Sequence, residues 1–237
     1  MKALILNSGI GSRMGDLTTT IPKCMIDLGN GETIIERQIE ILARQGITEI
    51  VITTGPHKDL LEGYLTGYFS QINFKFVHNP LYSQTNYIYS ILLAANELRE
   101  DVVLLHGDLV FEEGVLEAIL REKESSVVVC EKLPLPKKDF KAVIKGGKVQ
   151  AIGTEFFDEA LACQPLYKLN KEDWLKWLEQ IKVYCEKGQV NCYAEKALNE
   201  QLDEIAIYPF YIGDALCREI DNIEDLNKIR AYLRGMK

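Results

Sequence analysis

The sequence has no long hydrophobic run and no paired cysteines. No stretch approaches the roughly 20 apolar residues that a membrane-spanning helix needs, and the apolar run after Met1 ends at Gly9, too soon for a signal peptide. The six cysteines are scattered, and no two of them form a C-x-x-C pair. This pattern argues against a disulfide scaffold and favours reduced thiols. We therefore expect a cytoplasmic protein without a membrane partner.

The sequence also has few clustered positive charges. It carries 27 Lys and Arg against 35 Asp and Glu, a net charge of −8, and Lys137-Lys138 is its longest basic run. An acidic surface of this kind repels the phosphates of nucleic acids. We therefore expect no nucleic-acid partner.

Strand and helix patterns alternate in the first half of the chain. The 237 residues, of which 47% are hydrophobic, are enough to bury one sizeable core. Short apolar runs predict strands at 2–7, 47–55, 73–79, 101–108 and 125–131. Segments with apolar residues at helical spacing predict helices at 32–46, 58–69, 85–98 and 112–123. This order predicts an α/β fold, a three-layer αβα arrangement around a Rossmann-like, mostly parallel central sheet.

The pattern changes after about residue 132. A β-hairpin is expected at 140–153 around Gly146-Gly147, followed by a strand at 160–169 and helices at 170–188 and 193–202. Short strands at 205–213 and 217–221 and a last helix at 222–233 complete the chain. We expect one domain over 1–237. It would consist of a core at 1–132, an elaboration at 133–216 that covers the edge of the sheet where a ligand would bind, and a final strand and helix at 217–237.

A glycine-rich loop follows the first strand. Glycines at such a position let backbone N–H groups approach phosphate oxygens. The G-x-G-x-x-G fingerprint of dinucleotide-binding proteins does not fit, because Met14 stands where the third glycine belongs, and no Walker A sequence is present. The alternative is an ordinary glycine-rich turn with a surface arginine and lysine.

The loop resembles the signature of the nucleotidyltransferases that activate sugar phosphates and phosphocholine. That signature is a glycine pair, an arginine and, after a spacer, Pro-Lys, and seven positions match it: Leu6, Gly9, Gly11, Arg13, Met14, Pro22 and Lys23. The chain departs from it at Asn7-Ser8, where the family has two alanines.

The resemblance implies a GT-A-like nucleotidyltransferase and assigns roles to the loop. It implies that a nucleoside triphosphate contacts Leu6, Ser8, Gly9, Gly11, Ser12, Arg13, Lys23 and Gly107. Arg13 would hold the β- and γ-phosphates, and Lys23 would hold the α-phosphate and stabilise the transition state. The three segments then become a nucleotide-binding core, an acceptor-binding elaboration and a metal-ligand strand with its terminal helix.

Two aspartates are candidate ligands of Mg²⁺, which prefers carboxylate oxygens. Asp108 ends the strand at 101–108, and Asp221 stands between a short strand and the last helix, as the family's second metal-binding aspartate does. An aspartate in either place is also a common turn former or helix N-cap. Mg²⁺ is the cofactor that the resemblance implies.

The segment around Asn86 indicates which nucleotide is bound. Asn86, Tyr89 and Ser90 match the phosphocholine cytidylyltransferases of the bacterial lic type, and this resemblance extends over nearly the whole chain. It implies CTP, with Asn86 near the base or ribose. The alternative for Asn86 is a plain helix N-cap.

The second substrate is expected to be a small phosphorylated or phosphonated amine, such as phosphocholine or 2-aminoethylphosphonate. A cationic amine favours aromatic faces and a carboxylate, and the resemblance points to Tyr193 and Glu195. Lys141 would suit a phosphate or phosphonate oxygen. Trp174 and Trp177 are spaced as core residues of a helix.

Two alternatives remain open from the sequence. One is a sugar-1-phosphate nucleotidyltransferase that uses UTP, CTP or dTTP, and the other is an inactive binding module of the same fold. The sequence leaves the oligomeric state open, and a homodimer is compatible with it.

Overall fold

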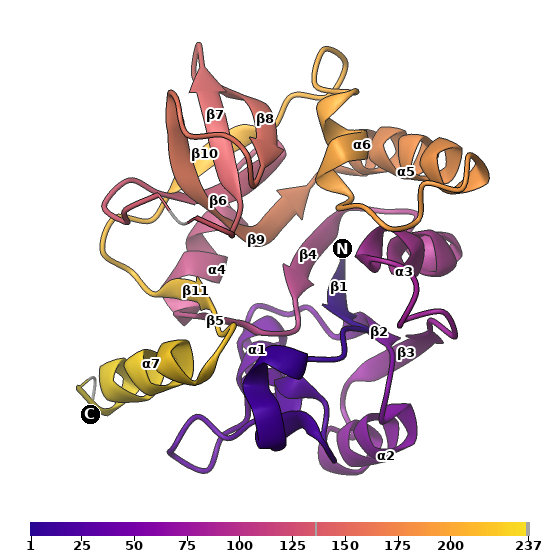
Figure 1. Cartoon of the computed structure of the whole chain (residues 1–237), viewed down its shortest axis with the longest axis vertical. Helices are drawn as coiled ribbons and strands as arrows, with labels where there is room; N and C mark the ends of the chain where they lie inside the picture. The colour runs from indigo at the N-terminus through magenta and orange to yellow at the C-terminus, as the bar shows by residue number, and fades with distance from the viewer. Residues whose placement is uncertain (136, 236–237) are drawn as a thin grey trace.

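The computed structural model describes residues 1–135 and 137–235. Its main sheet begins with four parallel strands in the spatial order β3-β2-β1-β4, as expected from the alternation of strands and helices (Figure 1). Leu4 is paired with Val51 on one side and with Leu104 on the other. The strands are β1 (Lys2–Asn7), β2 (Glu49–Thr54), β3 (Asn73–His78) and β4 (Val102–His106).

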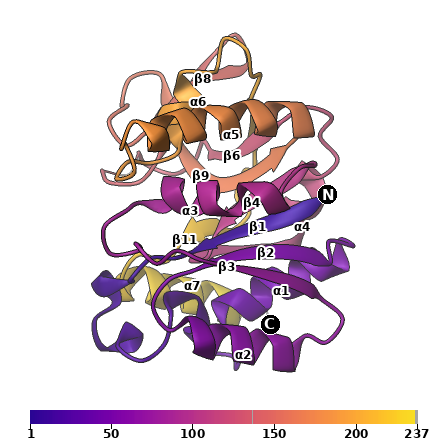
Figure 2. The ribbon, with the colours of Figure 1, turned by 90° about the vertical axis from the view of Figure 1, so that its right-hand side faces the viewer.

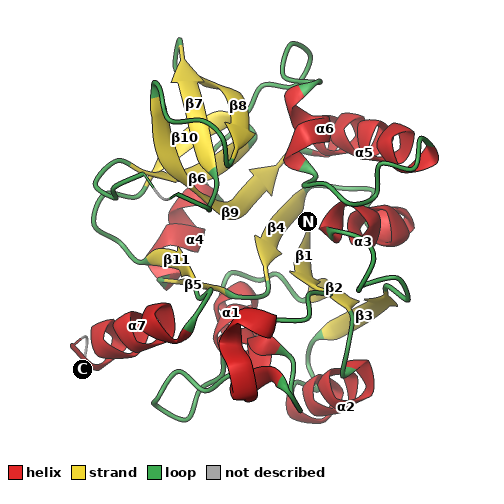
Figure 3. Ribbon diagram, in the orientation of Figure 1, coloured by secondary structure: helices red, strands yellow, loops and turns green. Residues whose placement is uncertain are grey.

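The second half of the chain continues this sheet. Strand β9 (Ala160–Leu169) is antiparallel to both of its long neighbours, β4 and β6 (Ser126–Cys130), and β10 (Tyr208–Tyr211) closes the edge beside β6. The hairpin of β7 (Lys141–Lys145) and β8 (Lys148–Gly153) pairs with β9 through β7 and lies near β10 (Figure 3).

Helices cover both faces of the sheet and bury two apolar cores. On one face lie α3 (Tyr87–Ala94), α5 (Lys171–Glu186) and the short α6 (Glu195–Asn199), and Figure 2 shows α3 and α5 side by side. The other face is covered by α1 (Ile34–Arg44), α2 (Lys58–Tyr68) and α4 (Glu113–Ile119). This arrangement confirms the expected three-layer fold with a mostly parallel sheet.

A third, smaller core fixes the end of the chain beside the opening loop. Helix α7 (Ile223–Gly235) packs Leu226 and Ile229 against Met14 and Ile34. The described residues also form the short 3-10 helices η1 (Ser12–Thr18), η2 (Lys23–Met25) and η3 (Ala95–Glu97). The packing of α7 therefore holds the residues before it close to the loop after β1.

Two features differ from the sequence-based expectation. Residues 109–111, which were not assigned to a strand, form β5 (Leu109–Phe111), and this strand is antiparallel to β11 (Cys217–Glu219) in a separate two-stranded sheet. The helices expected at 112–123 and 193–202 are shorter, at α4 and α6. The three-segment division stays a prediction, and residue 136 of its second segment and 236–237 of its third lie outside the described residues.

Candidate active site

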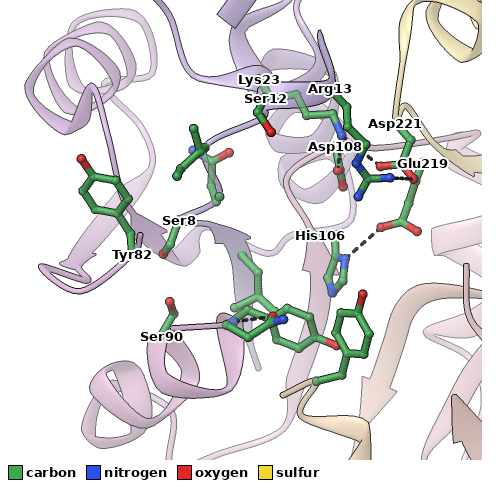
Figure 4. A pocket seen from close by; sticks show the side chains of 18 of the residues that line it. Ser8, Ser12, Arg13, Lys23, Tyr82, Ser90, His106, Asp108, Glu219 and Asp221 are labelled. Carbon is green, nitrogen blue, oxygen red and sulfur yellow. Dashed lines mark hydrogen bonds and ion pairs between the residues drawn. The ribbon is translucent and has the colours of Figure 1, made fainter. Parts of the chain in front are cut away.

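A cavity of about 770 Å³ opens beyond the carboxyl ends of β1, β3 and β4. Parallel α/β sheets bind ligands at this edge, and both the glycine-rich loop and Asp108 follow strands that end here. Of the predicted site residues, those that line it are Leu6, Ser8, Gly9, Gly11, Ser12, Arg13, Lys23, Asn86, Asp108, Tyr193 and Asp221. Residues from positions 6 to 221 therefore meet around one space (Figure 4).

Gly11 shapes the loop over this cavity. Its φ of +72° is one that residues with a side chain rarely adopt. A Cβ atom there would lie 3.2 Å from Thr18 Cγ2 and 3.3 Å from Lys23 Cβ. The Thr18 hydroxyl donates a hydrogen bond to the Gly11 carbonyl at 3.0 Å. A glycine at this position therefore lets the loop fold back closely on Lys23.

Lys23 lies between the two predicted metal-binding aspartates. Its Nζ is 2.6 Å from Asp108 Oδ2 and 3.4 Å from Asp221 Oδ1, while Arg13 reaches Asp221 Oδ2 at 2.8 Å (Figure 4). Burial alone would lower the pKa of Lys23, but the charge and hydrogen bond of Asp108, together with the charges of Asp221 and Glu219, outweigh burial and raise this pKa. Burial likewise favours the neutral acid of Asp108, but the charge and hydrogen bond of Lys23, together with the charge of His106, outweigh burial and lower the pKa of Asp108. The raised pKa of Lys23 and the lowered pKa of Asp108 keep this pair ionised near neutral pH.

The carboxylates suit a divalent cation. Asp108 and Asp221 both approach one point, the Lys23 ammonium, and both offer the hard oxygen ligands that Mg²⁺ prefers. A second arrangement shares Asp108: ligand atoms of His106, Asp108 and Glu219 lie within 4.8 Å of one another. The two aspartates therefore fit the predicted Mg²⁺, and Glu219 is a neighbouring carboxylate that the sequence patterns did not single out.

His106 and Glu219 form a partly shielded pair in the cavity wall. His106 Nδ1 is 2.9 Å from Glu219 Oε1. Burial opposes the charged imidazolium, but the hydrogen bond and charge of Glu219, together with the charges of Asp108 and Glu195, outweigh burial and raise the pKa of His106. Burial and the neighbouring Asp108 raise the pKa of Glu219. This end of the cavity therefore combines a carboxylate with a histidine beside the aspartates.

Aromatic rings stand next to that pair. The Tyr87 ring centroid is 4.9 Å from His106 and 5.9 Å from Tyr193, and Tyr193 is 5.0 Å from Phe140. All three aromatic residues line the cavity with Glu219. The wall thus combines aromatic rings with a carboxylate, the groups with which proteins bind organic cations.

The opposite end of the cavity is lined by neutral polar groups. Figure 4 shows Ser8, Tyr82 and Ser90 on the side away from Lys23 and Asp108. Asn86 caps α3 by accepting a hydrogen bond from the Tyr87 N–H at 2.7 Å. Asn86 therefore acts as a helix N-cap. Its contact with a nucleotide stays a prediction.

Three predicted site residues do not line the cavity themselves. Gly107 lies under Asn7, since a Cβ atom on it would stand 2.7 Å from Asn7 Oδ1. Lys141 is buried with its Nζ 4.1 Å from the ring centroid of Phe157. Glu195 is buried and accepts hydrogen bonds from the hydroxyls of Tyr87 and Tyr167, the latter at 2.9 Å. Their direct contact with substrate stays a prediction.

Several lining residues were missed by the sequence analysis. They include Asn79, Tyr82, Tyr87, Asp139 and Glu219. Glu219 had a usable signal, because it lies two residues before Asp221 at the end of a short strand, where alternate side chains face the same way. The others depend on how loops cross in space, which local patterns do not encode.

The structure also describes the cysteines, the two tryptophans and the helices outside the site. All six cysteines are free. Trp174 and Trp177 are fully buried in the core, as their spacing predicted. Within residues 1–135 and 137–235, no helix combines the length and apolar character needed to cross a bilayer.

Comparisons with known proteins point to one family. The chain is 33% identical over 138 residues to the CTP:phosphoglutamine cytidylyltransferase of Campylobacter jejuni, and 29% identical over 159 residues to the CMP-5'-(3-aminopropyl)phosphonate synthase of Streptomyces rubellomurinus. These matches cover 56% and 67% of the chain, but only 53% and 25% of the two relatives. The choline-phosphate cytidylyltransferase of Streptococcus pneumoniae is 26% identical, over 99% of both chains.

Solved structures share the fold. The CTP:phosphocholine cytidylyltransferase of Streptococcus pneumoniae superposes with a TM-score of 0.78 at 23% identity, over 98% of each chain. A putative glucose-1-phosphate thymidylyltransferase from Bacillus anthracis reaches 0.84 at 19% identity, over 100% of this chain and 96% of its own. The family model of the MobA-like NTP transferase domain matches residues 3–234, and the chain therefore belongs to that nucleotidyltransferase family.

Proposed function

We propose that the protein is a cytidylyltransferase. It transfers CMP from CTP to a small phosphorylated or phosphonated amine and releases pyrophosphate. The observation that carries this proposal is the aromatic wall of Tyr87, Phe140 and Tyr193 with Glu219, directly beside the cluster of Lys23, Asp108 and Asp221. Support also comes from the relatives, which are named for CTP or CMP and for phosphocholine, phosphoglutamine or an aminophosphonate.

The amine of the acceptor would lie among the rings. A cation over an aromatic face gains roughly 0.5 to 2 kcal/mol, more when water is excluded. Glu219 supplies the opposite charge. The buried Glu195 accepts a hydrogen bond from the Tyr87 hydroxyl and so fixes the position of that ring. Glu195 is then a positioning residue, which revises its expected role from direct contact. The phosphate or phosphonate end would point toward Lys23 and the aspartates.

The reaction is an in-line displacement at the α-phosphorus of CTP. An anionic oxygen of the acceptor forms the new P–O bond, and the bond to the β-phosphate oxygen breaks as pyrophosphate leaves. This oxygen is already deprotonated near neutral pH, so no general base is required. Lys23 neutralises charge at the α-phosphate and Arg13 at the departing phosphates, so catalysis is positioning plus electrostatic stabilisation.

A divalent cation would complete the charge neutralisation. Asp108 and Asp221 would hold Mg²⁺, which would offset the negative charge of the phosphates. Lys23, at 2.6 and 3.4 Å from these carboxylates, keeps both oriented toward the cavity.

The proposal is tested by measuring pyrophosphate release with Mg²⁺ for a grid of substrate pairs. CTP, UTP, dTTP, ATP and GTP are each combined with phosphocholine, 2-aminoethylphosphonate, phosphoethanolamine and glucose-1-phosphate. We expect turnover with CTP and a phospho- or phosphono-amine. Turnover with glucose-1-phosphate alone would replace the proposal by the sugar-1-phosphate alternative, and nucleotide binding without turnover would favour a binding module.

A further inference from the structure

The amide of Asn79 has a fixed orientation at the uncharged end of the cavity. Its Oδ1 accepts a hydrogen bond from the Leu81 N–H at 2.9 Å. Its Nδ2 donates to Thr85 Oγ1 at 3.0 Å and to Ser90 Oγ at 2.9 Å. A backbone N–H only donates, so the oxygen of Asn79 must face Leu81 and both amide hydrogens must face the two hydroxyls. Asn79 and Ser90 are each 1% exposed, and Asn79 directly follows β3.

This arrangement decides what the Ser90 hydroxyl offers to a ligand. Ser90 Oγ accepts from Asn79, which leaves its own proton to be donated elsewhere. Serines in helices often donate to the carbonyl four residues earlier, but no bond from Ser90 to such a carbonyl exists in the described part of the chain. Thr85, by contrast, donates to the Leu81 carbonyl at 2.9 Å and is satisfied.

Ser90 lines the cavity, and a second hydroxyl lies at the same end. Ser8 Oγ is buried and has no hydrogen-bond partner among the described residues. Figure 4 shows both serines on the side of the cavity away from the charged cluster around Lys23. The phosphates belong at the charged cluster, so this end is left for the nucleotide base.

We propose that Ser90, oriented by Asn79, is a specificity-determining residue that donates a hydrogen bond to the ring nitrogen N3 of cytosine. This inference rests on the proposed function. Cytosine N3 is an acceptor, whereas uracil carries a hydrogen at N3 and is a donor there. The unpartnered Ser90 proton therefore finds an acceptor in CTP, whereas in UTP it faces the N3–H and is left buried without an acceptor.

Two substitutions test the direction of this hydrogen bond. Ser90→Ala removes the donor, and we expect kcat/KM for CTP to fall about tenfold while that for UTP falls less. Asn79→Asp replaces the amide donor by a carboxylate that accepts from Ser90, so Ser90 would turn its lone pairs to the cavity. We then expect the ratio of kcat/KM for CTP over UTP to fall further than in Ser90→Ala.

The matched control is Ser126→Ala. Ser126 is also 1% exposed, and its hydroxyl donates to the Glu124 carbonyl at 3.1 Å at the start of β6, at the opposite edge of the sheet from the cavity. It should leave the CTP over UTP ratio unchanged. Circular dichroism melts of all variants identify any that fail to fold, and the ratio within one variant cancels a general loss of active protein.

The outcomes separate this inference from the proposed function. Wild-type turnover with CTP and an unchanged CTP over UTP ratio in both variants would overturn the role of Ser90 and leave the proposed function standing. A wild-type preference for UTP would overturn both. A ratio that falls in Ser90→Ala and falls further in Asn79→Asp supports the inference.

Discussion

Lys23 joins two carboxylates that come from distant parts of the chain. Its Nζ contacts Asp108 and Asp221 at 2.6 and 3.4 Å, and all three side chains are largely shielded from water. In such a site a fixed positive charge acts more strongly on a developing negative charge than it would in water.

Replacing Lys23 by methionine therefore tests its catalytic role. Lys23→Met keeps the length of the side chain but removes its charge, and we expect kcat to fall about 100- to 1,000-fold, as when one oxyanion-stabilising donor is lost. Lys58→Met is the control, because Lys58 is a half-buried residue of α2 outside the cavity wall. A Lys23→Met enzyme within threefold of the wild-type kcat would contradict the assignment.

Glu219 tests the acceptor site separately from the nucleotide site. Glu219→Gln removes the negative charge beside the aromatic wall, and we expect the KM for the phospho-amine to rise about tenfold while the KM for CTP is unchanged. Steady-state kinetics with each substrate varied in turn measure both. Glu224→Gln, at an exposed position on α7, should change neither. A rise in the KM for CTP alone would argue against an amine at Glu219.

At the scale of the element, Gly107 allows the segment after β4 to approach the end of β1 closely beneath the site. A Cβ atom on Gly107 would lie 2.7 Å from Asn7 Oδ1 and 3.1 Å from the Leu6 carbonyl oxygen. Contacts this short force neighbouring atoms to move, and Asp108 is the next residue.

We expect Gly107→Ala to lower both stability and activity. The overpacking should lower the free energy of unfolding by about 1 to 3 kcal/mol, measured by urea denaturation. The variant should also have a lower kcat. Gly63→Ala is the control, since Gly63 lies inside α2 with nothing within 4 Å of the added Cβ. That change should stabilise the protein by about 0.5 to 1 kcal/mol. Equal effects of the two would contradict the account.

Two tryptophans on α5 are similarly buried, but only one of them donates a hydrogen bond to the segment that carries Tyr193 of the aromatic wall. Trp177 Nε1 donates to the Ala194 carbonyl at 3.0 Å, next to Tyr193, and Trp174 Nε1 donates to the Leu98 carbonyl at 2.9 Å, away from the cavity. Both are fully buried. Each indole therefore supports a different segment of backbone.

Replacing each by phenylalanine should cost similar stability and different function. We expect Trp174→Phe and Trp177→Phe each to lose about 1 to 3 kcal/mol, because a buried carbonyl loses its donor. Trp177→Phe should also raise the KM for the acceptor, since Tyr193 is released, and Trp174→Phe should not. Thermal melts and acceptor kinetics test this, and an identical KM in both variants would count against the support of Tyr193 by Trp177.

At the scale of the whole molecule, much of the architecture was predictable from local patterns. The first four parallel strands, the hairpin and the 160–169 strand follow from short apolar runs, helical periodicity and glycine turns. The insertion of β9 between β4 and β6, and the pairing of β5 with β11, were not predictable. Such pairings depend on which strands meet in the folded chain, and their local sequences do not specify a partner.

The candidate site was likewise predictable from the sequence only in part. Motif spacing and family resemblance singled out Lys23, Asp108 and Asp221, although Lys23 and Asp221 are 198 residues apart. The Asn79–Ser90 hydrogen bond and the contact of Glu219 with His106 join segments whose approach is set by tertiary packing. Sequence patterns therefore identified the charged centre of the cavity better than its two ends.

The most direct test of the central claim is to identify the product by ³¹P nuclear magnetic resonance. The protein is incubated with Mg²⁺, CTP and either phosphocholine or 2-aminoethylphosphonate, with glucose-1-phosphate as the comparison. We predict a pair of coupled phosphorus signals from a new anhydride that joins CMP to the phospho-amine, and pyrophosphate in equal amount. An anhydride formed only with glucose-1-phosphate, or unchanged CTP with every acceptor, would contradict the account.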